Sequence, residues 1–166
     1  MLFRSWREVV EAGKEFNLQP CGLGARNTLR LEGKLALYGH EISDTITVWE
    51  AGIDRWLRMD KGEFIGRRAL DRQRAEGLSR TLVGLEMIER GIGRDGYKVL
   101  DEGGKEIGYV TSGSYAPFLK KNIALAYVPP QFSAVDTIVG VEIRGQAVKA
   151  KVVPTPFYKK PPKKKE

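Results

Sequence analysis

The segment PCGLGARNTLRLE, residues 20–32, decides how the first part of this chain folds. A proline and two glycines interrupt regular structure, and the Ala, Leu, Arg and Glu residues that follow favour a helix. The pattern predicts a glycine hinge at residues 22–24 and a helix at residues 25–32. That helix would begin with free backbone N–H groups and the positive end of the helix dipole, and Arg26 would add a cation in its first turn.

Arg26 has two possible uses. Its planar guanidinium suits a carboxylate or a polar heterocycle, so it could contact a ligand. From spacing alone, a structural salt bridge is the commoner role, and both stay open. A dinucleotide-binding loop is excluded, because a helix rather than a strand precedes Gly22 and the third glycine of that fingerprint is absent.

Apolar spacing predicts two further helices. Residues 3–16 form an amphipathic pattern that ends at Asn17 and Pro20. Residues 66–75 form a helix with a basic outer side, stopped by Gly77. Residues 45–56 carry no clear pattern.

After residue 80 the sequence pattern changes, and short apolar runs alternate with turn residues. The pattern indicates an all-β sandwich or small barrel, with a boundary at residues 77–79. Glycines in segments 101–105 and 144–146 indicate hairpin turns. The predicted strands are residues 82–87, 97–100, 106–114, 123–128, 138–143 and 147–153.

Composition restricts the class of protein. The chain has 166 residues, 42% of them apolar, and lacks both a signal-peptide pattern and an apolar run long enough to span a membrane. Its single cysteine fits a reducing cytoplasm. Much of the net charge of +7 comes from residues 159–166, where five lysines stand against one glutamate. Such a tail can bind nucleic acid or an acidic partner, although two prolines favour a solvated tail.

Other reactive residues offer little catalytic chemistry. His40 is the only histidine and is expected to be structural, and Cys21, beside Pro20, is expected to be a small buried residue. No metal site and no nucleophile–base–orienter set can be assembled from one histidine. Lys120 and Lys121, in a loop between two strands, could meet an acidic ligand or partner, or could simply be solvated.

Four stretches in order resemble the aminomethyltransferase family, the T-protein of the glycine cleavage system. In that family about half of the polypeptide precedes the first stretch, so this chain resembles the C-terminal half only. The stretches are residues 20–32, then WEAGI and KGEFIGRRAL at 49–53 and 61–70, then TSGS and LKKNIALAYVP at 111–114 and 119–129, then VEIRG to PFY at 141–158.

The resemblance implies an α+β fold. Residues 1–79 would be the C-terminal part of the central folate-binding domain, residues 80–158 a small antiparallel β-barrel, and residues 159–166 a basic tail. Enzymes of the family move a one-carbon unit from the aminomethyl-lipoyl arm of a carrier protein, the H-protein, to tetrahydrofolate and release ammonia.

By the same resemblance, Arg26 matches the arginine of the folate pocket, and Tyr158, with Lys159, matches the position that closes it. The family's catalytic aspartate and pterin-binding glutamate lie in the N-terminal half, so no catalytic residue is expected in this chain. The resemblance therefore implies a chain that is inactive alone. Either a separate N-terminal polypeptide completes it, or it is a truncated product. No membrane or nucleic-acid partner is expected.

Some residues depart from the family pattern. Asn27 stands where the family has an aspartate that could orient Arg26, and Val48 stands where a proline is usual. The related iron–sulfur repair proteins carry Lys-Gly-Cys-Tyr where residues 61–64 read KGEF, which argues against that branch. The alternatives are a related folate-dependent demethylase, or a non-catalytic module that uses its basic tail to bind nucleic acid or an acidic partner.

Overall fold

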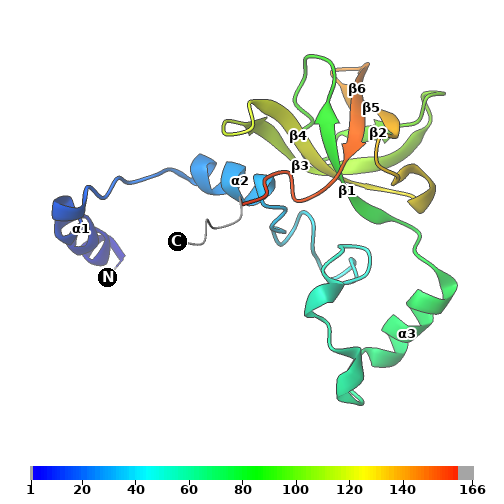
Figure 1. Cartoon of the computed structure of the whole chain (residues 1–166), viewed down its shortest axis with the longest axis horizontal. Coiled ribbons are helices and arrows are strands. Elements are labelled where there is room, and N and C mark those ends of the chain that lie inside the picture. Colours follow the sequence, from blue (N-terminus) through cyan, green and yellow to red (C-terminus); the bar gives the residue numbers. More distant parts are fainter. Residues whose placement is uncertain (1, 161–166) are drawn as a thin grey trace, which may run out of the picture.

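The computed structural model describes residues 2–160, which form a six-stranded barrel and a helical arm whose parts extend away from the barrel in two directions (Figure 1). The arm and its connections contain three α-helices and short 3₁₀ turns. These elements are α1 (Leu2–Ala12), η1 (Lys14–Phe16), α2 (Leu23–Glu32), η2 (Asp54–Trp56), η3 (Met59–Lys61) and α3 (Arg67–Glu76). The barrel contains β1 (Thr81–Met87), β2 (Lys98–Leu100), β3 (Glu106–Ala116), β4 (Lys121–Val128), η4 (Pro130–Phe132), β5 (Ile138–Ile143) and β6 (Gln146–Val153).

The strands pair antiparallel in the order β1-β4-β3-β2-β5-β6, and β6 pairs back onto β1 to close the sheet. Closure decides between the sandwich and the barrel that the strand pattern left open. It also leaves no row of unpaired backbone groups along a sheet edge. All six predicted strands are confirmed, although β1, β3 and β4 extend beyond the apolar runs because ladder hydrogen bonds continue into polar residues.

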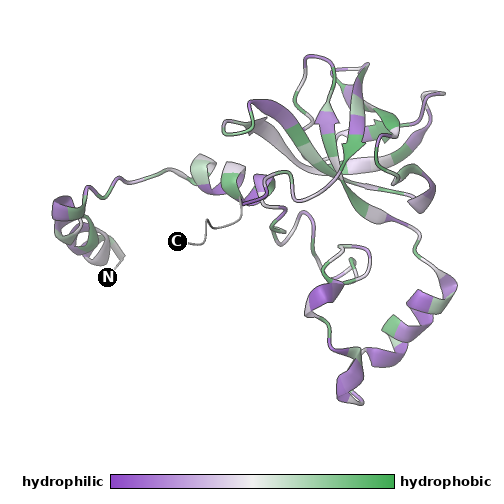
Figure 2. Cartoon of the chain, viewed as in Figure 1, coloured by the Kyte–Doolittle hydropathy of each residue, from purple (hydrophilic) through white to green (hydrophobic). Residues whose placement is uncertain are grey.

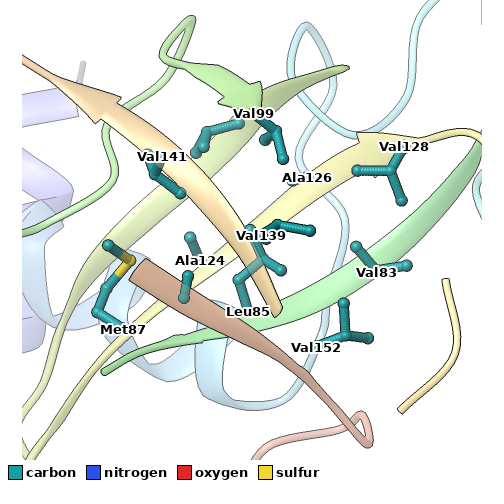
Figure 3. Packing of buried hydrophobic residues seen from close by; sticks show 12 residues of the cluster. Val83, Leu85, Met87, Val99, Ala124, Ala126, Val128, Val139, Val141 and Val152 are labelled. Atoms are coloured by element: carbon teal, nitrogen blue, oxygen red, sulfur yellow. The ribbon is translucent and has the colours of Figure 1, made fainter. Parts of the chain in front are cut away.

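Small branched side chains fill the inside of the barrel. Leu85, Val99, Val110 and Val141 are fully buried there together with three alanines (Figure 3). Short side chains suit this interior because a small barrel has little room between opposite walls.

A second apolar cluster lies on the outside of β1 and β4. Leu31 from α2 packs there with Leu82, Leu125 and Tyr127, so residues 82–85 of β1 are buried on both faces. The end of α2 is therefore fixed to the barrel, and this joint positions the rest of the helix.

The predicted helix over residues 3–16 is interrupted. Helix α1 ends at Ala12 and η1 follows, because Gly13 lets the chain turn so tightly that a Cβ there would lie 2.5 Å from Leu18. Asn17 ends this turn in the left-handed region, as the sequence predicts. Helix α2 begins at Leu23, earlier than expected, and α3 ends before Gly77 as predicted.

Within residues 2–160, nothing from the barrel packs against the apolar side of α1. Helix α1 stands away from the barrel at the far end of the arm (Figure 1), and its Trp6 is 55% exposed. None of the helices within residues 2–160 is long and apolar enough to cross a membrane. Most of the basic tail, residues 161–166, lies outside the described residues.

Candidate functional site

Arg26 lies in the first half of α2 with its side chain exposed. Within residues 2–160 its guanidinium forms no ion pair, so the structural salt bridge considered from the sequence is not made there. The charge of Arg26 is therefore not neutralised by the protein and is available to a ligand.

One helical turn later, Arg30 is buried and fully engaged. Its Nη1 donates to Glu41 Oε2 at 2.8 Å, and its Nη2 donates to Ser112 Oγ at 2.8 Å. Ser112 belongs to β3, so this arginine ties α2 directly to the barrel. The sequence analysis missed Arg30. Local spacing gave no signal for Arg30, because, of its two leucine neighbours, only Leu31 is buried and Leu29 is exposed.

Glu41 is a fully buried carboxylate with both oxygens satisfied. Oε1 accepts from Thr111 Oγ1 at 2.8 Å, and Oε2 accepts from the Leu37 amide at 2.9 Å as well as from Arg30. The Glu41 carbonyl accepts from Tyr127 Oη at 2.8 Å. A buried charge persists only when it is paired and hydrogen-bonded in this way. We call Arg30, Glu41, Thr111 and Ser112 the α2–barrel network.

Asn27, which stands where the family has an aspartate, contacts Arg30 in the structure. Its Oδ1 accepts from Arg30 Nε at 3.0 Å and from Arg30 Nη2 at 2.8 Å, so Asn27 holds Arg30 and not Arg26. The reason is helix geometry, because side chains three positions apart share a face and adjacent ones do not. The neutral side-chain amide of Asn27 makes these contacts with Arg30 without adding a second carboxylate beside Glu41.

A second buried carboxylate, Glu50, lies in the 49–53 motif. Glu50 Oε1 accepts from Arg80 Nε at 2.9 Å, and Oε2 accepts from the Thr47 amide at 2.8 Å. Burial alone would raise the pKa of Glu50, but the hydrogen bonds from Thr47 and Arg80 outweigh it and hold that pKa below its usual value. The Arg80 guanidinium also lies 5.3 Å from the ring centroid of Tyr127. Burial raises the pKa of the Tyr127 phenol far above its usual value.

Tyr158 is held at the end of α2. Its amide donates to the Glu32 carbonyl at 2.9 Å, and its ring meets that of Phe118 edge-on at 5.1 Å (Figure 1 shows the C-terminal segment passing α2). The segment can cross β1 because Gly84 has no side chain, and a Cβ there would lie 2.4 Å from Thr155. Arg26 and Glu32 are six residues apart, about 9 Å along the helix axis. The structure thus places Tyr158, in the C-terminal segment, beside the last residue of the helix that carries Arg26.

Lys159 lines a different hollow. This pocket, of about 330 Å³, also holds Lys121, Glu86 and Phe157. Lys121 Nζ pairs with Glu86 at 2.9 Å, whereas Lys120 is exposed.

The remaining candidates are structural or exposed. His40 Nδ1 donates to the Thr111 carbonyl at 3.0 Å and lies 3.5 Å from the Asp95 carboxylate, in line with the expected structural role. The expectation that Cys21 is buried is wrong. It lies in the extended link before α2, where nothing packs over it. In the described part of the chain, no three His, Cys, Asp or Glu residues gather as metal ligands.

Two family models and several known proteins match most of this chain. Residues 2–61 match the family model described as the GCVT N-terminal domain, and residues 80–159 match the glycine cleavage T-protein C-terminal barrel domain. Aminomethyltransferases from Koribacter versatilis and Acidobacterium capsulatum are 71% and 63% identical to this chain over 96% of its length. The chain spans only 42% and 43% of those relatives.

A solved structure shows the same architecture. The glycine cleavage system aminomethyltransferase T from Bartonella henselae superposes with a TM-score of 0.86 and is 32% identical. The match covers 92% of this chain and 43% of that protein. The barrel and the helical elements packed on it are thus shared with a complete enzyme more than twice as long.

Proposed function

Because the chain belongs to the aminomethyltransferase family, the T-proteins of the glycine cleavage system, we propose that it supplies the C-terminal portion of such an enzyme. The whole enzyme would transfer the one-carbon unit from the aminomethyl-lipoyl arm of the H-protein to tetrahydrofolate and release ammonia. The observation that carries the proposal for this chain is the unneutralised guanidinium of Arg26 on a helix that is fixed to the barrel.

The residues present fit tetrahydrofolate in chemical type. The pterin ring presents amide-like groups and the glutamate tail presents carboxylates, and an arginine can donate two parallel hydrogen bonds to either. We assign Arg26 to contact with the folate and Tyr158, with Lys159, to closing its pocket. The anchoring of the Tyr158 amide on Glu32 supports that assignment, because it holds the C-terminal segment against α2.

The α2–barrel network would position Arg26 without touching the substrate. Arg30 is clamped by Glu41 and Ser112, which leaves α2 little freedom to rotate or slide on the barrel. A fixed helix matters because small displacements of a binding group weaken its interactions. In this proposal the barrel serves as a rigid support for one wall of the folate site.

We propose no catalytic residue among these 166, because none of them matches the catalytic aspartate of the family. The chain alone should therefore fail to turn over H-protein and tetrahydrofolate. The exposed apolar side chains of the arm are suited to association with the remaining part of a folate-binding domain, on the same polypeptide or a separate one. The exposed free thiol of Cys21 fits the reducing cytoplasm that we propose as its location.

Calorimetric titration with tetrahydrofolate tests the assignment of Arg26. Arg26→Ala should weaken binding by about 1–3 kcal/mol, as expected for the loss of a charged hydrogen bond. Arg68→Ala is the matched control, because Arg68 is an exposed arginine on another helix, and it should leave the affinity unchanged. Equal affinities for all three proteins would remove Arg26 from the folate site.

Two further measurements, with the carrier protein and with nucleic acid, separate the alternatives. A folate-dependent demethylase would bind folate but would not accept the aminomethyl-lipoyl carrier. A non-catalytic module that uses its basic tail would bind nucleic acid or an acidic protein with steep salt dependence, and would lose that binding when residues 159–166 are deleted.

A further inference from the structure

Among the strand pairs that close the barrel over residues 81–153, the pair β2–β5 is the shortest. These two strands pair at only two positions, through Val99 and Leu100 of β2, whereas β5 pairs with β6 along its whole length. Past Leu100 the chain turns back at residues 101–105 towards β3. Ile138 and Val139, the first residues of β5, therefore have a strand partner on one side only.

Two adjoining hollows, each of about 490 Å³, lie where β2 and β5 separate. Asp101 and Glu102 of the β2–β3 turn and Ile138 of β5 line both hollows. One hollow reaches Phe132 in η4, and the other passes over the outside of β5 to Ala147 of β6. We call the two hollows together the seam groove. Since β2 and β5 stand opposite β1 and β4 in the ring of strands, the groove is on the side of the barrel away from the end of α2 (Figure 1).

The backbone at the start of β5 can accept a further strand in this groove. In an antiparallel ladder, successive residues direct their N–H and C=O groups to opposite neighbours. Of Ile138 and Val139, one therefore directs these groups towards β6 and the other towards the groove, where no strand pairs with it. Strand backbone without a partner is the template to which an extended peptide adds.

The turn that borders the groove is acidic, although the chain has a net charge of +7. Asp101 Oδ1 accepts from two backbone amides of its own turn at 2.9 Å, which fixes this carboxylate in place. Glu102 beside it is exposed and forms no ion pair within residues 2–160. Asp136, also at the groove, is paired with Lys151, and Lys149 stands on the β6 side. A cationic side chain of a partner is therefore attracted to the turn, whereas the phosphates of a nucleic acid would be repelled there.

Small residues leave room for a long side chain between the turn and β6. Gly140 has no side chain, and a Cβ there would already lie 3.4 Å from Ala147. Ala147 is exposed, and Ile138 is 37% exposed, so both offer accessible apolar surface. The stem of a lysine or arginine suits this surface, because its methylenes can cover apolar atoms while its charged head reaches the carboxylates of the turn.

We propose that the seam groove binds an extended, basic segment of a partner protein, which adds as a short strand beside the first part of β5. A lysine or arginine of that segment lies over Ala147 with its charged head at Glu102. An apolar side chain on the other face of the added strand meets Phe132. The surface does not depend on the proposed aminomethyltransferase function, since it uses neither Arg26 nor the α2–barrel network.

The experiment is an NMR titration of the ¹⁵N-labelled 166-residue chain, at constant ionic strength, with the end-capped peptide Lys-Val-Lys-Val-Lys. The amide signals of Glu102, Ile138 and Gly140 should shift together and saturate. The same peptide methylated at every backbone nitrogen keeps its charges but cannot donate main-chain hydrogen bonds, so it should bind about tenfold more weakly or worse. A peptide with glutamate in place of lysine should not bind.

Two variants with matched controls locate the peptide. Glu102→Lys replaces an attraction with a repulsion and should weaken binding about three- to tenfold, whereas Glu76→Lys makes the same change on α3 and should have no effect. Ala147→Phe fills the outer part of the groove and should also weaken binding, whereas Ala75→Phe on α3 should not. All four positions are exposed, so the fold should be retained in each variant.

Four results would overturn the proposal. Shifts that do not saturate, or that spread over the surface carboxylates, would mean that no site exists. Equal binding of the backbone-methylated peptide would mean that charge alone attracts it and that no strand is added. Unchanged affinity in Glu102→Lys and Ala147→Phe would place the peptide elsewhere. Shifts of the same amides with chain concentration alone, lost on deletion of residues 159–166, would show that the groove takes the basic tail of a second copy and not another protein.

Discussion

The barrel and the arm use the same kinds of apolar residue with opposite results. In the barrel, Leu85 and Val141 are completely buried, because closure of the sheet brings their side chains face to face. In the arm, Trp6 and Leu23 are exposed, and Ile65 lies fully in solvent. Figure 2 shows apolar residues on both regions. Burial therefore depends on whether a facing surface exists, and hydrophobicity alone does not secure it.

A third region joins the two. Residues 30–51 carry the buried carboxylates Glu41 and Glu50, each paired with an arginine, and the Leu82 amide donates to the Glu50 carbonyl at 3.0 Å. These polar contacts specify one orientation of α2 on the barrel, which a purely apolar contact would define less strictly. The predictions that follow test this division into barrel, joint and arm.

The largest effect should come from breaking the joint. Glu41→Ala leaves Arg30 buried without its carboxylate, so the free energy of unfolding should fall by about 3–5 kcal/mol. Urea denaturation measures the change. Asp60→Ala is the control, because Asp60 pairs with Arg58 at the surface, and it should leave stability unchanged. Equal stabilities of the two variants would mean that the network does not hold α2 on the barrel.

A matched pair of truncations compares the barrel with the arm. Leu85→Ala should lower the free energy of unfolding by about 2–5 kcal/mol, because it opens a cavity in a closed core. Trp6→Ala removes a larger side chain but should leave unfolding of the barrel within about 0.5 kcal/mol of the unaltered chain. Thermal unfolding followed by circular dichroism tests both. A large loss of stability in Trp6→Ala would show that α1 packs against this chain.

The smallest effect should be the pH dependence from Glu50. Its folded pKa lies below its unfolded value, so its ionised form contributes stability above about pH 4.3 and loses it as the pH falls through the folded pKa. Glu50→Gln should cost about 1–3 kcal/mol at pH 7, and the difference from the unaltered chain should shrink below pH 4. Urea midpoints from pH 2.5 to 7 measure this, and a difference that is constant with pH would contradict the assignment.

Local patterns predicted much of the fold. Short apolar runs separated by turn residues located all six strands. Closure of the barrel followed from the family resemblance and not from the strand pattern, which allowed a sandwich as well, because the β1–β6 pairing joins the two ends of the domain. The pattern over residues 3–16 predicted a helix but neither its interruption at Gly13 nor the exposure of its apolar side.

The candidate site was less predictable. The position of Arg26 in the motif singled it out, and its role in folate binding stays a prediction. Arg30 was missed because its partners Glu41 and Ser112 lie 11 and 82 residues away in the sequence. The expectation for Cys21 was wrong because a small apolar residue is buried only where the chain provides a neighbour. Contacts between segments that lie far apart in the sequence therefore determine the features that the sequence pattern could not predict.

Hydrogen exchange measured residue by residue tests the central claim most directly. We predict slow exchange in the barrel strands and the end of α2, and fast exchange throughout α1 in the monomeric chain. Adding the complementary N-terminal portion of the Koribacter versatilis relative should slow exchange in α1 and in the first half of α2. Strong protection of α1 in the monomeric chain, or no change when that portion is added, would contradict the account.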